Sequence, residues 1–161
     1  MANIIISPSK YVQGKGELAN IAQYATKLGK KPFILISEGG KKRVGGIIED
    51  SFKDTGCELV FEAFHGECSK NEINRLVAIV KEKGCDLVIG VGGGKIFDTA
   101  KAVAYYVESP VIVCPTIAAT DAPCSALTVV YTDDGVFEEY LWLPANPNLV
   151  LVDTDLSLIH I

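Results

Sequence analysis

The stretch GVGGGKIFDTAKA, residues 90–102, constrains the fold more than any other part of the chain. It places four glycines between an apolar run typical of a buried strand and an amphipathic run with helical spacing. A turn that leaves a strand and opens a helix directs successive backbone N–H groups and the helix dipole at one point, which favours an anion. Gly92, Gly93 and Gly94 let the backbone approach a phosphate closely, and Lys95 adds a positive charge.

Two standard phosphate-binding fingerprints do not fit this turn. A P-loop would require glycine at Ile89 and a magnesium-binding hydroxyl at Ile96. A Gly-x-Gly-x-x-Gly pattern counted from Gly90 brings Lys95 to the third glycine. A mononucleotide kinase is therefore disfavoured, and a tight turn without a ligand is the alternative to a phosphate site.

The rest of the chain alternates between two patterns. Short runs rich in valine and isoleucine predict buried strands at residues 33–37, 58–64, 86–91, 111–115 and 149–153. Helical spacing predicts helices at residues 16–28, about 44–54, 69–83 and 95–107, and Ser69 with Glu72 forms a capping-box pattern at the third. Two β-like runs around Gly135 predict a hairpin. We expect the α/β class: a Rossmann-like parallel sheet with flanking helices plus a β-hairpin.

Charge and composition exclude several classes. A net charge of −5 argues against a nucleic-acid partner, which would require a basic face. The apolar runs are far shorter than the ~20 residues that span a bilayer, and no signal-peptide pattern starts the chain, so we expect no membrane partner and a cytoplasmic location. The five cysteines form no Cys-x-x-Cys pair and fit free thiols. His65, Glu67 and Cys68 are too few for a metal site, since the other histidine is the remote His160.

A second segment, PTIAATDAPCSAL at residues 115–127, is small and hydroxylated and directly follows an apolar strand. In an open α/β sheet the carboxyl ends of the strands line the ligand crevice, so this loop is expected to share a cleft with the glycine turn. Asp121 would there accept hydrogen bonds from a polyol, and the alternative is a capping or turn aspartate.

At these residues the sequence resembles the glycerol dehydrogenases of the iron-containing, metal-dependent (type III) alcohol dehydrogenase family. The resemblance covers residues 4 to about 154 and is carried by the glycine stretch together with SPSKYVQGKGEL, GECSKNEINRL, PTIAATDAPCSALTVVYTDDGVFEEY and NPNLVLVDT. It implies an amino-terminal NAD-binding α/β domain followed by a helical metal-binding domain, in a homo-oligomer. The implied reaction is the NAD-linked oxidation of glycerol to dihydroxyacetone with zinc or another divalent metal.

The resemblance also implies individual contacts. Asp121 would contact the glycerol hydroxyls. Ser37, followed by Glu38, stands where close relatives carry an aspartate for the adenosine ribose, so either Glu38 substitutes or the preference for NAD over NADP is weaker. The implied cofactor-binding residues are Ser37, Glu38, Gly92, Gly93, Gly94, Lys95, Asp98, Thr116, Ile117, Ala118, Ala119, Ser125, Leu127 and Tyr131.

The ending of the chain departs from the family pattern. We expect residues 1–154 to be the NAD-binding domain and residues 155–161 to be a divergent tail, with the family's metal ligands and helical domain lying beyond the matched residues. The chain would then be an amino-terminal portion without metal ligands or catalytic residues of its own, and inactive alone. The alternatives are a non-catalytic nucleotide-binding or interaction module, and a related alcohol or glycerol-1-phosphate dehydrogenase.

Overall fold

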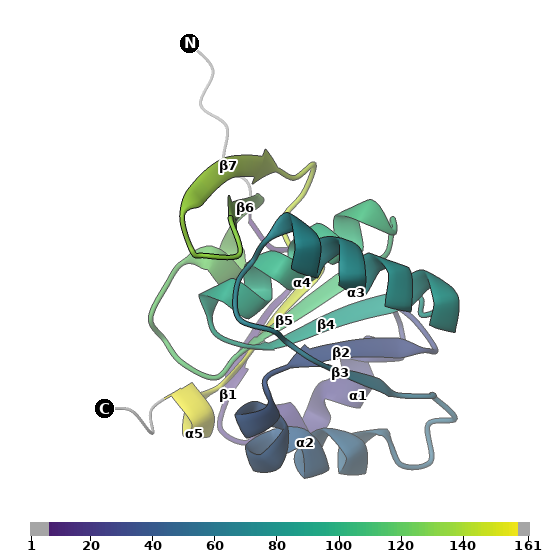
Figure 1. The fold of residues 1–161 in the computed structure, drawn as a ribbon. Helices are drawn as coiled ribbons and strands as arrows, with labels where there is room; N and C mark the ends of the chain where they lie inside the picture. The colour runs from purple at the N-terminus through teal and green to yellow at the C-terminus, as the bar shows by residue number, and fades with distance from the viewer. Residues whose placement is uncertain (1–6, 158–161) are drawn as a thin grey trace.

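Six parallel strands form the central sheet of the computed structural model, which describes residues 7–157 (Figure 1). Their order across the sheet is β1-β8-β5-β4-β2-β3, and every neighbouring pair is parallel. The strands are β1 (Tyr11–Gly14), β2 (Pro32–Ile36), β3 (Val60–Ala63), β4 (Leu87–Gly92), β5 (Val111–Pro115) and β8 (Leu149–Asp153). The predicted parallel α/β architecture is confirmed, and the short strand β1 is an addition to it.

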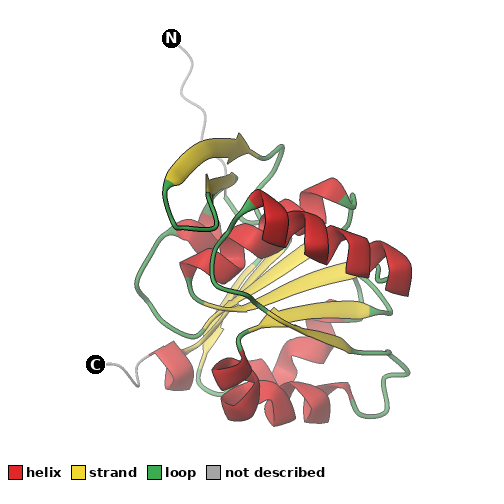
Figure 2. Cartoon of the chain, viewed as in Figure 1, coloured by secondary structure: helices red, strands yellow, loops and turns green. Residues whose placement is uncertain are grey.

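Helices cover both faces of this sheet (Figure 2). On one face lie α1 (Ile21–Ala25) and α2 (Glu38–Phe52), and on the other lie α3 (Lys70–Lys83) and α4 (Gly94–Tyr106). Along β2, Phe33 packs into the core on the α3 and α4 side, whereas Ile34 packs into the core on the α1 and α2 side. Strands buried on both faces have no polar side to alternate with, which explains their continuous apolar runs.

The start of α2 corrects the prediction of a helix near residue 44. The helix begins at Glu38 because the Ser37 hydroxyl caps it, accepting a hydrogen bond from the Gly40 N–H at 3.0 Å. Two consecutive glycines in the first turn, Gly39 and Gly40, conceal this helix start in the sequence, since glycine disfavours helix interiors.

The helix predicted over residues 16–28 is a 3₁₀ helix, η1 (Glu17–Asn20), followed by the short α1. Gly16 adopts a left-handed conformation with φ of 70° immediately before η1. The Asp153 carboxylate at the end of β8 accepts hydrogen bonds from the Gly16 and Leu18 N–H groups at 3.1 and 3.0 Å. This cap fixes a tight first turn that the apolar spacing alone does not reveal.

The predicted cap of α3 is confirmed in one of its two bonds. The Ser69 hydroxyl accepts a hydrogen bond from the Glu72 N–H at 3.2 Å, and Gly84 ends the helix with φ of 63°. The Glu72 carboxylate does not return to Ser69; it accepts from the His65 N–H at 3.0 Å and pairs with Arg75 at 2.8 Å. The loop before α3 is therefore held by Glu72 rather than by a complete capping box.

The predicted hairpin is present as an antiparallel pair of strands, β6 (Leu127–Tyr131) and β7 (Phe137–Trp142), outside the main sheet. It packs on α4 (Figure 1), where Asp98 accepts a hydrogen bond from the Val129 N–H at 3.2 Å and its carbonyl accepts from the Thr128 hydroxyl at 3.1 Å. A short 3₁₀ helix, η2 (Ala122–Cys124), precedes β6. The hairpin thus packs against the amino-terminal half of α4.

The segment after β8 begins with a short helix, α5 (Thr154–Ser157). Leu156 packs against the core on the α1 and α2 side. Residues 158–161 of the predicted divergent tail, including His160, lie outside the described residues. Within residues 7–157, no helix has the length and apolar character to cross a bilayer.

Candidate functional site

Three of the segments predicted to bind a cofactor follow neighbouring strands at the same edge of the sheet. Ile36 at the end of β2 pairs with Val91 in β4, and Gly92 pairs with Pro115 at the end of β5. The loops after β2 and β4 lead to helices on opposite faces, which is the arrangement at which open α/β sheets bind their ligands. Ser37, the glycine turn and Thr116 therefore lie side by side where an open α/β sheet binds ligands.

The amino terminus of α4 lies at this edge of the sheet. Gly93 occupies the N-cap position, and no side chain within residues 7–157 bonds the first N–H groups of the helix. The turn is held instead by a backbone hydrogen bond, in which the Thr116 N–H donates to the Gly92 carbonyl at 2.9 Å. Uncapped N–H groups of a helix of this length form an anion site together with the helix dipole.

The glycines of the turn serve two different purposes. A Cβ at Gly90 would lie 2.7 Å from the Ala100 Cβ, so Gly90 is required for α4 to pack closely on β4. A Cβ at Gly92 would lie 2.5 Å from the end of the Ile96 side chain. At Gly93 and Gly94, by contrast, the nearest atoms would be 3.7 and 3.4 Å away, and neither residue has positive φ. Neither packing nor backbone conformation requires glycine at these two positions, whereas the close approach of a ligand would require it at both.

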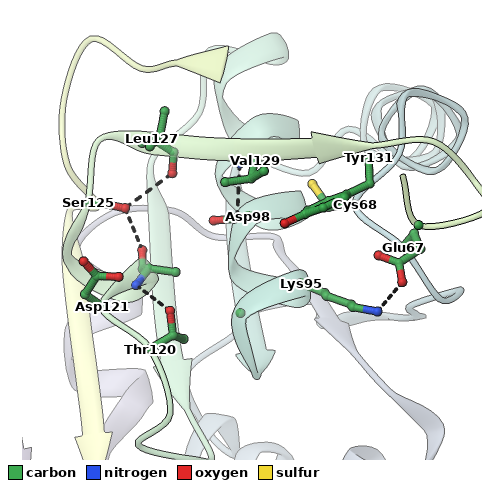
Figure 3. A pocket seen from close by; sticks show the side chains of 13 residues that line it. Glu67, Cys68, Lys95, Asp98, Thr120, Asp121, Ser125, Leu127, Val129 and Tyr131 are labelled. Carbon is green, nitrogen blue, oxygen red and sulfur yellow. Dashed lines mark hydrogen bonds and ion pairs between the residues drawn. The ribbon is translucent and has the colours of Figure 1, made fainter. Parts of the chain in front are cut away.

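Lys95 follows the turn and forms an ion pair with Glu67 from the loop before α3 (Figure 3). The Lys95 side chain is 59% exposed and that of Glu67 is 19% exposed. An ion pair this exposed is held weakly, so the ammonium remains able to turn toward an anion. The predicted role of Lys95 as a countercharge thus has a competitor that the sequence did not indicate.

A cavity of about 470 Å³ opens beside this turn, between α4, η2 and β6 (Figure 3). Seven of the predicted site residues line it: Gly94, Lys95, Asp98, Asp121, Ser125, Leu127 and Tyr131. The other lining residues, which the sequence analysis did not assign to a binding role, are Glu67, Cys68, Thr120, Ala122, Val129 and Gly135. They come from the loop before α3, the segment around η2 and the hairpin, and no local motif marks them.

Asp121 presents a free carboxylate to this cavity. It occupies the N-cap position of η2 but makes no side-chain capping bond, and the residue is exposed. Within the described part of the chain, its carboxylate oxygens have no hydrogen-bond or ion-pair partner within bonding distance. The oxygens are therefore available as acceptors for hydroxyl groups of a ligand.

Asp98 has a more internal position than Asp121. The residue is 8% exposed, and its carboxylate faces the Val129 N–H and lies 3.0 Å from the Lys101 ammonium. Burial raises the pKa of Asp98 above its ordinary value, and the Lys101 charge opposes this shift. Asp98 thus lines the cavity while joining α4 to the hairpin.

The remaining predicted residues lie outside this cavity. Ser37 and Glu38 border a separate cavity of about 110 Å³ at the start of α2, where Ser37 is the helix cap and Glu38 is exposed. Thr116, Ile117, Ala118 and Ala119 form the loop that leaves β5 toward η2. Ser37 and Glu38 thus extend the site along the edge of the sheet, and the loop of residues 116–119 connects this edge to Asp121.

The cysteines and histidines offer no metal centre within residues 7–157. No group of three histidine, cysteine or acidic side chains that could hold a metal ion occurs there. Cys68, which lines the large cavity, is buried, and burial raises the pKa of its thiol to about 12. His65 contributes its backbone N–H to Glu72.

Residues 8–154 match the family model for iron-containing alcohol dehydrogenases. The chain belongs to this family. A glycerol dehydrogenase from Escherichia coli is 48% identical over 158 residues, and one from Thermotoga maritima is 46% identical over 157 residues. These alignments cover 96% and 97% of the chain and 42% of each relative.

The solved structures of the family agree with this assignment. The crystal structure of a probable glycerol dehydrogenase from Sinorhizobium meliloti superimposes with a TM-score of 0.89 at 43% sequence identity. The match covers 98% of this chain and 42% of that structure. The chain therefore has the fold of the corresponding part of this family member and spans less than half of its length.

Proposed function

We propose that residues 1–154 form the NAD-binding domain of a glycerol dehydrogenase, which oxidises glycerol to dihydroxyacetone. The observation that carries this proposal is the uncapped amino terminus of α4 at Gly93 and Gly94, next to a cavity that contains the free Asp121 carboxylate. The glycerol dehydrogenases that this chain resembles at 46–48% identity support the choice of substrate.

The cofactor would lie along the edge of the sheet. Its pyrophosphate would bind the N–H groups of Gly93 and Gly94, with Lys95 supplying a positive charge. The adenosine ribose would face the start of α2, and the loop of residues 116–119 would cover the middle of the dinucleotide. When bound, NAD supplies the acceptor for the hydride that leaves the carbinol carbon. The nicotinamide end would enter the large cavity, which Ser125, Leu127 and Tyr131 line.

The charges of the cavity favour a neutral polyol over a phosphorylated substrate. Among the described residues that line the cavity, Glu67, Asp98 and Asp121 carry carboxylates and Lys95 is the single basic residue. A phosphate monoester would meet net negative charge there, which favours glycerol over glycerol-1-phosphate. Asp121 would orient glycerol by accepting hydrogen bonds from its hydroxyl groups.

A metal does not fit the donor groups of this part of the chain. The family description names iron, and the metal ion of a longer protein, zinc or another divalent cation, would need ligands outside residues 7–157, which contain no suitable group. We therefore propose that this chain positions NAD and glycerol but does not catalyse turnover by itself.

One observation favours the alternative of a non-catalytic interaction module. The outer strand of the hairpin exposes Phe137, Tyr140 and Trp142, with 51%, 55% and 73% of their surfaces accessible. Exposed aromatic groups of this kind promote association, with other chains or between copies of this one. Homo-oligomeric assembly and a cytoplasmic location remain predictions.

Calorimetric titration with NAD and an assay for NADH formation from glycerol in the presence of zinc separate these functions. We expect NAD binding without turnover by the 161-residue chain. Binding of neither NAD nor NADP would contradict the proposed cofactor site. Concentration-dependent association without nucleotide binding would favour the interaction module.

A further inference from the structure

Lys101 is a lysine in the interior of the protein. It lies in the middle of α4, and its side chain is 0% exposed. Burying an ammonium group is unfavourable unless hydrogen bonds and an opposite charge compensate for the lost water. A lysine at this position therefore calls for an explanation in terms of what its ammonium contacts.

The acceptors around this ammonium come mainly from one short segment, residues 122–127, which contains η2 and enters β6. Nζ of Lys101 donates to the carbonyl oxygens of Ala122 at 2.8 Å and Ser125 at 3.4 Å, and to that of Leu127. The Ser125 hydroxyl lies 3.3 Å away, and the Asp98 carboxylate lies 3.0 Å away. One side chain thus contacts the beginning, middle and end of the segment.

This segment has few other attachments among the residues that the structure describes. Asn146 donates to the Cys124 carbonyl, and the Leu143 N–H donates to the Ala126 carbonyl at 3.0 Å. Both of these partners follow β7 and do not belong to α4. Asp98 of α4 bonds the next two residues, Thr128 and Val129, so within residues 122–127 it is Lys101 that supplies the hydrogen bonds from α4.

We propose that Lys101 is a positioning residue that sets the distance between the Asp121 side of the cavity and the amino terminus of α4. The inference rests on the proposed function, because that distance would determine whether the nicotinamide end of the cofactor and a polyol fit together in the cavity. Lys101 touches neither ligand; it acts through the carbonyl groups of residues 122–127.

The chemistry of the contacts distinguishes positioning from simple neutralisation of Asp98. A single carboxylate needs one opposite charge, whereas this ammonium also bonds three backbone carbonyls of the same segment. A Lys101→Met variant keeps the length of the side chain and removes the donors. An Asp98→Asn/Lys101→Met double variant removes both charges, so that it leaves no unpaired buried carboxylate.

Amide hydrogen exchange tests the link without any ligand. In the Lys101→Met variant we expect exchange in residues 121–127 to accelerate by about tenfold or more, since hydrogen bonds to a charged group are lost, while β2 exchanges as in the unaltered chain. The double variant should show the same acceleration. Lys83→Met, at the exposed carboxyl end of α3, is the matched control. Unchanged exchange in residues 121–127, or equal acceleration in β2, would overturn the proposal.

Titrations with ADP-ribose and NAD test the consequence for binding. ADP-ribose contains the pyrophosphate but lacks the nicotinamide. We expect the Lys101→Met variant to bind ADP-ribose as the unaltered chain does, and both variants to bind NAD about tenfold more weakly. Equal weakening of ADP-ribose and NAD binding, or recovery of NAD binding in the double variant, would show that Lys101 acts as a structural counter-ion. Either result would overturn the proposal.

The two experiments separate the failure of this inference from that of the proposed function. If the unaltered chain binds neither ADP-ribose nor NAD, the proposed cofactor site is wrong, and the hydrogen-exchange result still decides whether Lys101 positions residues 122–127. If the unaltered chain binds both ligands and the variants exchange and bind as it does, the cofactor site stands and the role of Lys101 is wrong.

Discussion

Asp133, in the turn of the hairpin, accepts a hydrogen bond from the hydroxyl of Ser69, the cap of α3, at 2.5 Å. The same carboxylate accepts from the Asn71 amide, and Lys70 pairs with Glu138 at 2.8 Å in β7. The tip of the hairpin is therefore fastened to α3, while the strand β6 is fastened to α4 through Asp98. These contacts fix the position of the hairpin, which contributes part of the lining of the large cavity.

Replacing Asp133 by asparagine should loosen the hairpin in a pH-dependent way. The Ser69 and Asn71 hydrogen bonds lower the pKa of Asp133 below its ordinary value of 3.8. The stabilisation is therefore present above pH 3.8 and is lost as the pH falls through the lower pKa of the folded state. We expect Asp133→Asn to unfold at lower urea concentration than the unaltered chain at pH 7, and the difference between the two midpoints to be smaller at pH 3. Fluorescence of Trp142, the single tryptophan, reports the transition. An equal difference at both pH values would contradict the assignment.

Alanine substitutions at two glycines of the turn should have different effects, one on stability and the other on NAD affinity. Gly90→Ala places a methyl group 2.7 Å from Ala100 and should destabilise the fold by about 1–3 kcal/mol, because α4 must move away from β4. Gly94→Ala meets its nearest atom at 3.4 Å and should change stability by less than about 1 kcal/mol. The second variant should nevertheless lose NAD affinity, since its methyl group would occupy the space that we propose for the pyrophosphate. Thermal unfolding and calorimetric NAD titrations on both variants provide the check. A Gly94→Ala variant with normal NAD affinity would refute the proposed pyrophosphate site at Gly93 and Gly94.

Removing the charge of Glu67 should strengthen nucleotide binding. In Glu67→Gln the Lys95 ammonium no longer has an anionic partner, so we expect NAD affinity to rise by about two- to fivefold with little change in stability. Lys95→Met should lower the affinity. A salt series of NAD titrations provides a further control, because the gain in Glu67→Gln should shrink as salt screens the charges. Equal affinity in both variants would show that Lys95 does not meet the phosphate.

Cofactor selectivity should depend on Glu38. The Ser37 hydroxyl already accepts the Gly40 N–H as a helix cap, so in the proposed site the exposed Glu38 carboxylate would accept from the ribose hydroxyls and would repel a 2′-phosphate. We expect Glu38→Gln to bind NAD more weakly and NADP more tightly. Competition between the two cofactors measures the ratio, and an unchanged ratio would exclude Glu38 from the ribose site.

Much of this fold follows from local patterns, because strands buried on both faces and a capped amphipathic helix leave clear periodicities. The start of α2 and the tight turn before α1 depend on Ser37 and Asp153, and the latter lies more than a hundred residues from its partners. The spacing of neighbouring residues in the sequence cannot reveal a contact between residues that lie so far apart in the chain. The strand β1 is similarly hidden, since it is short and partly exposed and is defined by pairing with β8.

In the candidate site, too, some residues are marked by the local sequence and others are defined by tertiary contacts. The glycine turn and Asp121 stand out in the sequence because their residue types are unusual after apolar strands. The pairing of Lys95 with Glu67 and the burial of Lys101 depend on how the loop before α3 and the hairpin pack around α4. Glu67 and Lys101 are ordinary surface residues by sequence, and only the tertiary arrangement places Glu67 in the cavity lining and Lys101 in the interior.

Chemical-shift mapping of the ¹⁵N-labelled chain during titration with NAD tests the central claim most directly. We predict that the largest amide shifts occur at Gly93, Gly94 and Lys95, and at residues 37–38 and 116–119, with smaller shifts around the cavity at residues 121–131. Shifts confined to the exposed face of β7, or none at saturating NAD, would contradict a cofactor site at the glycine turn.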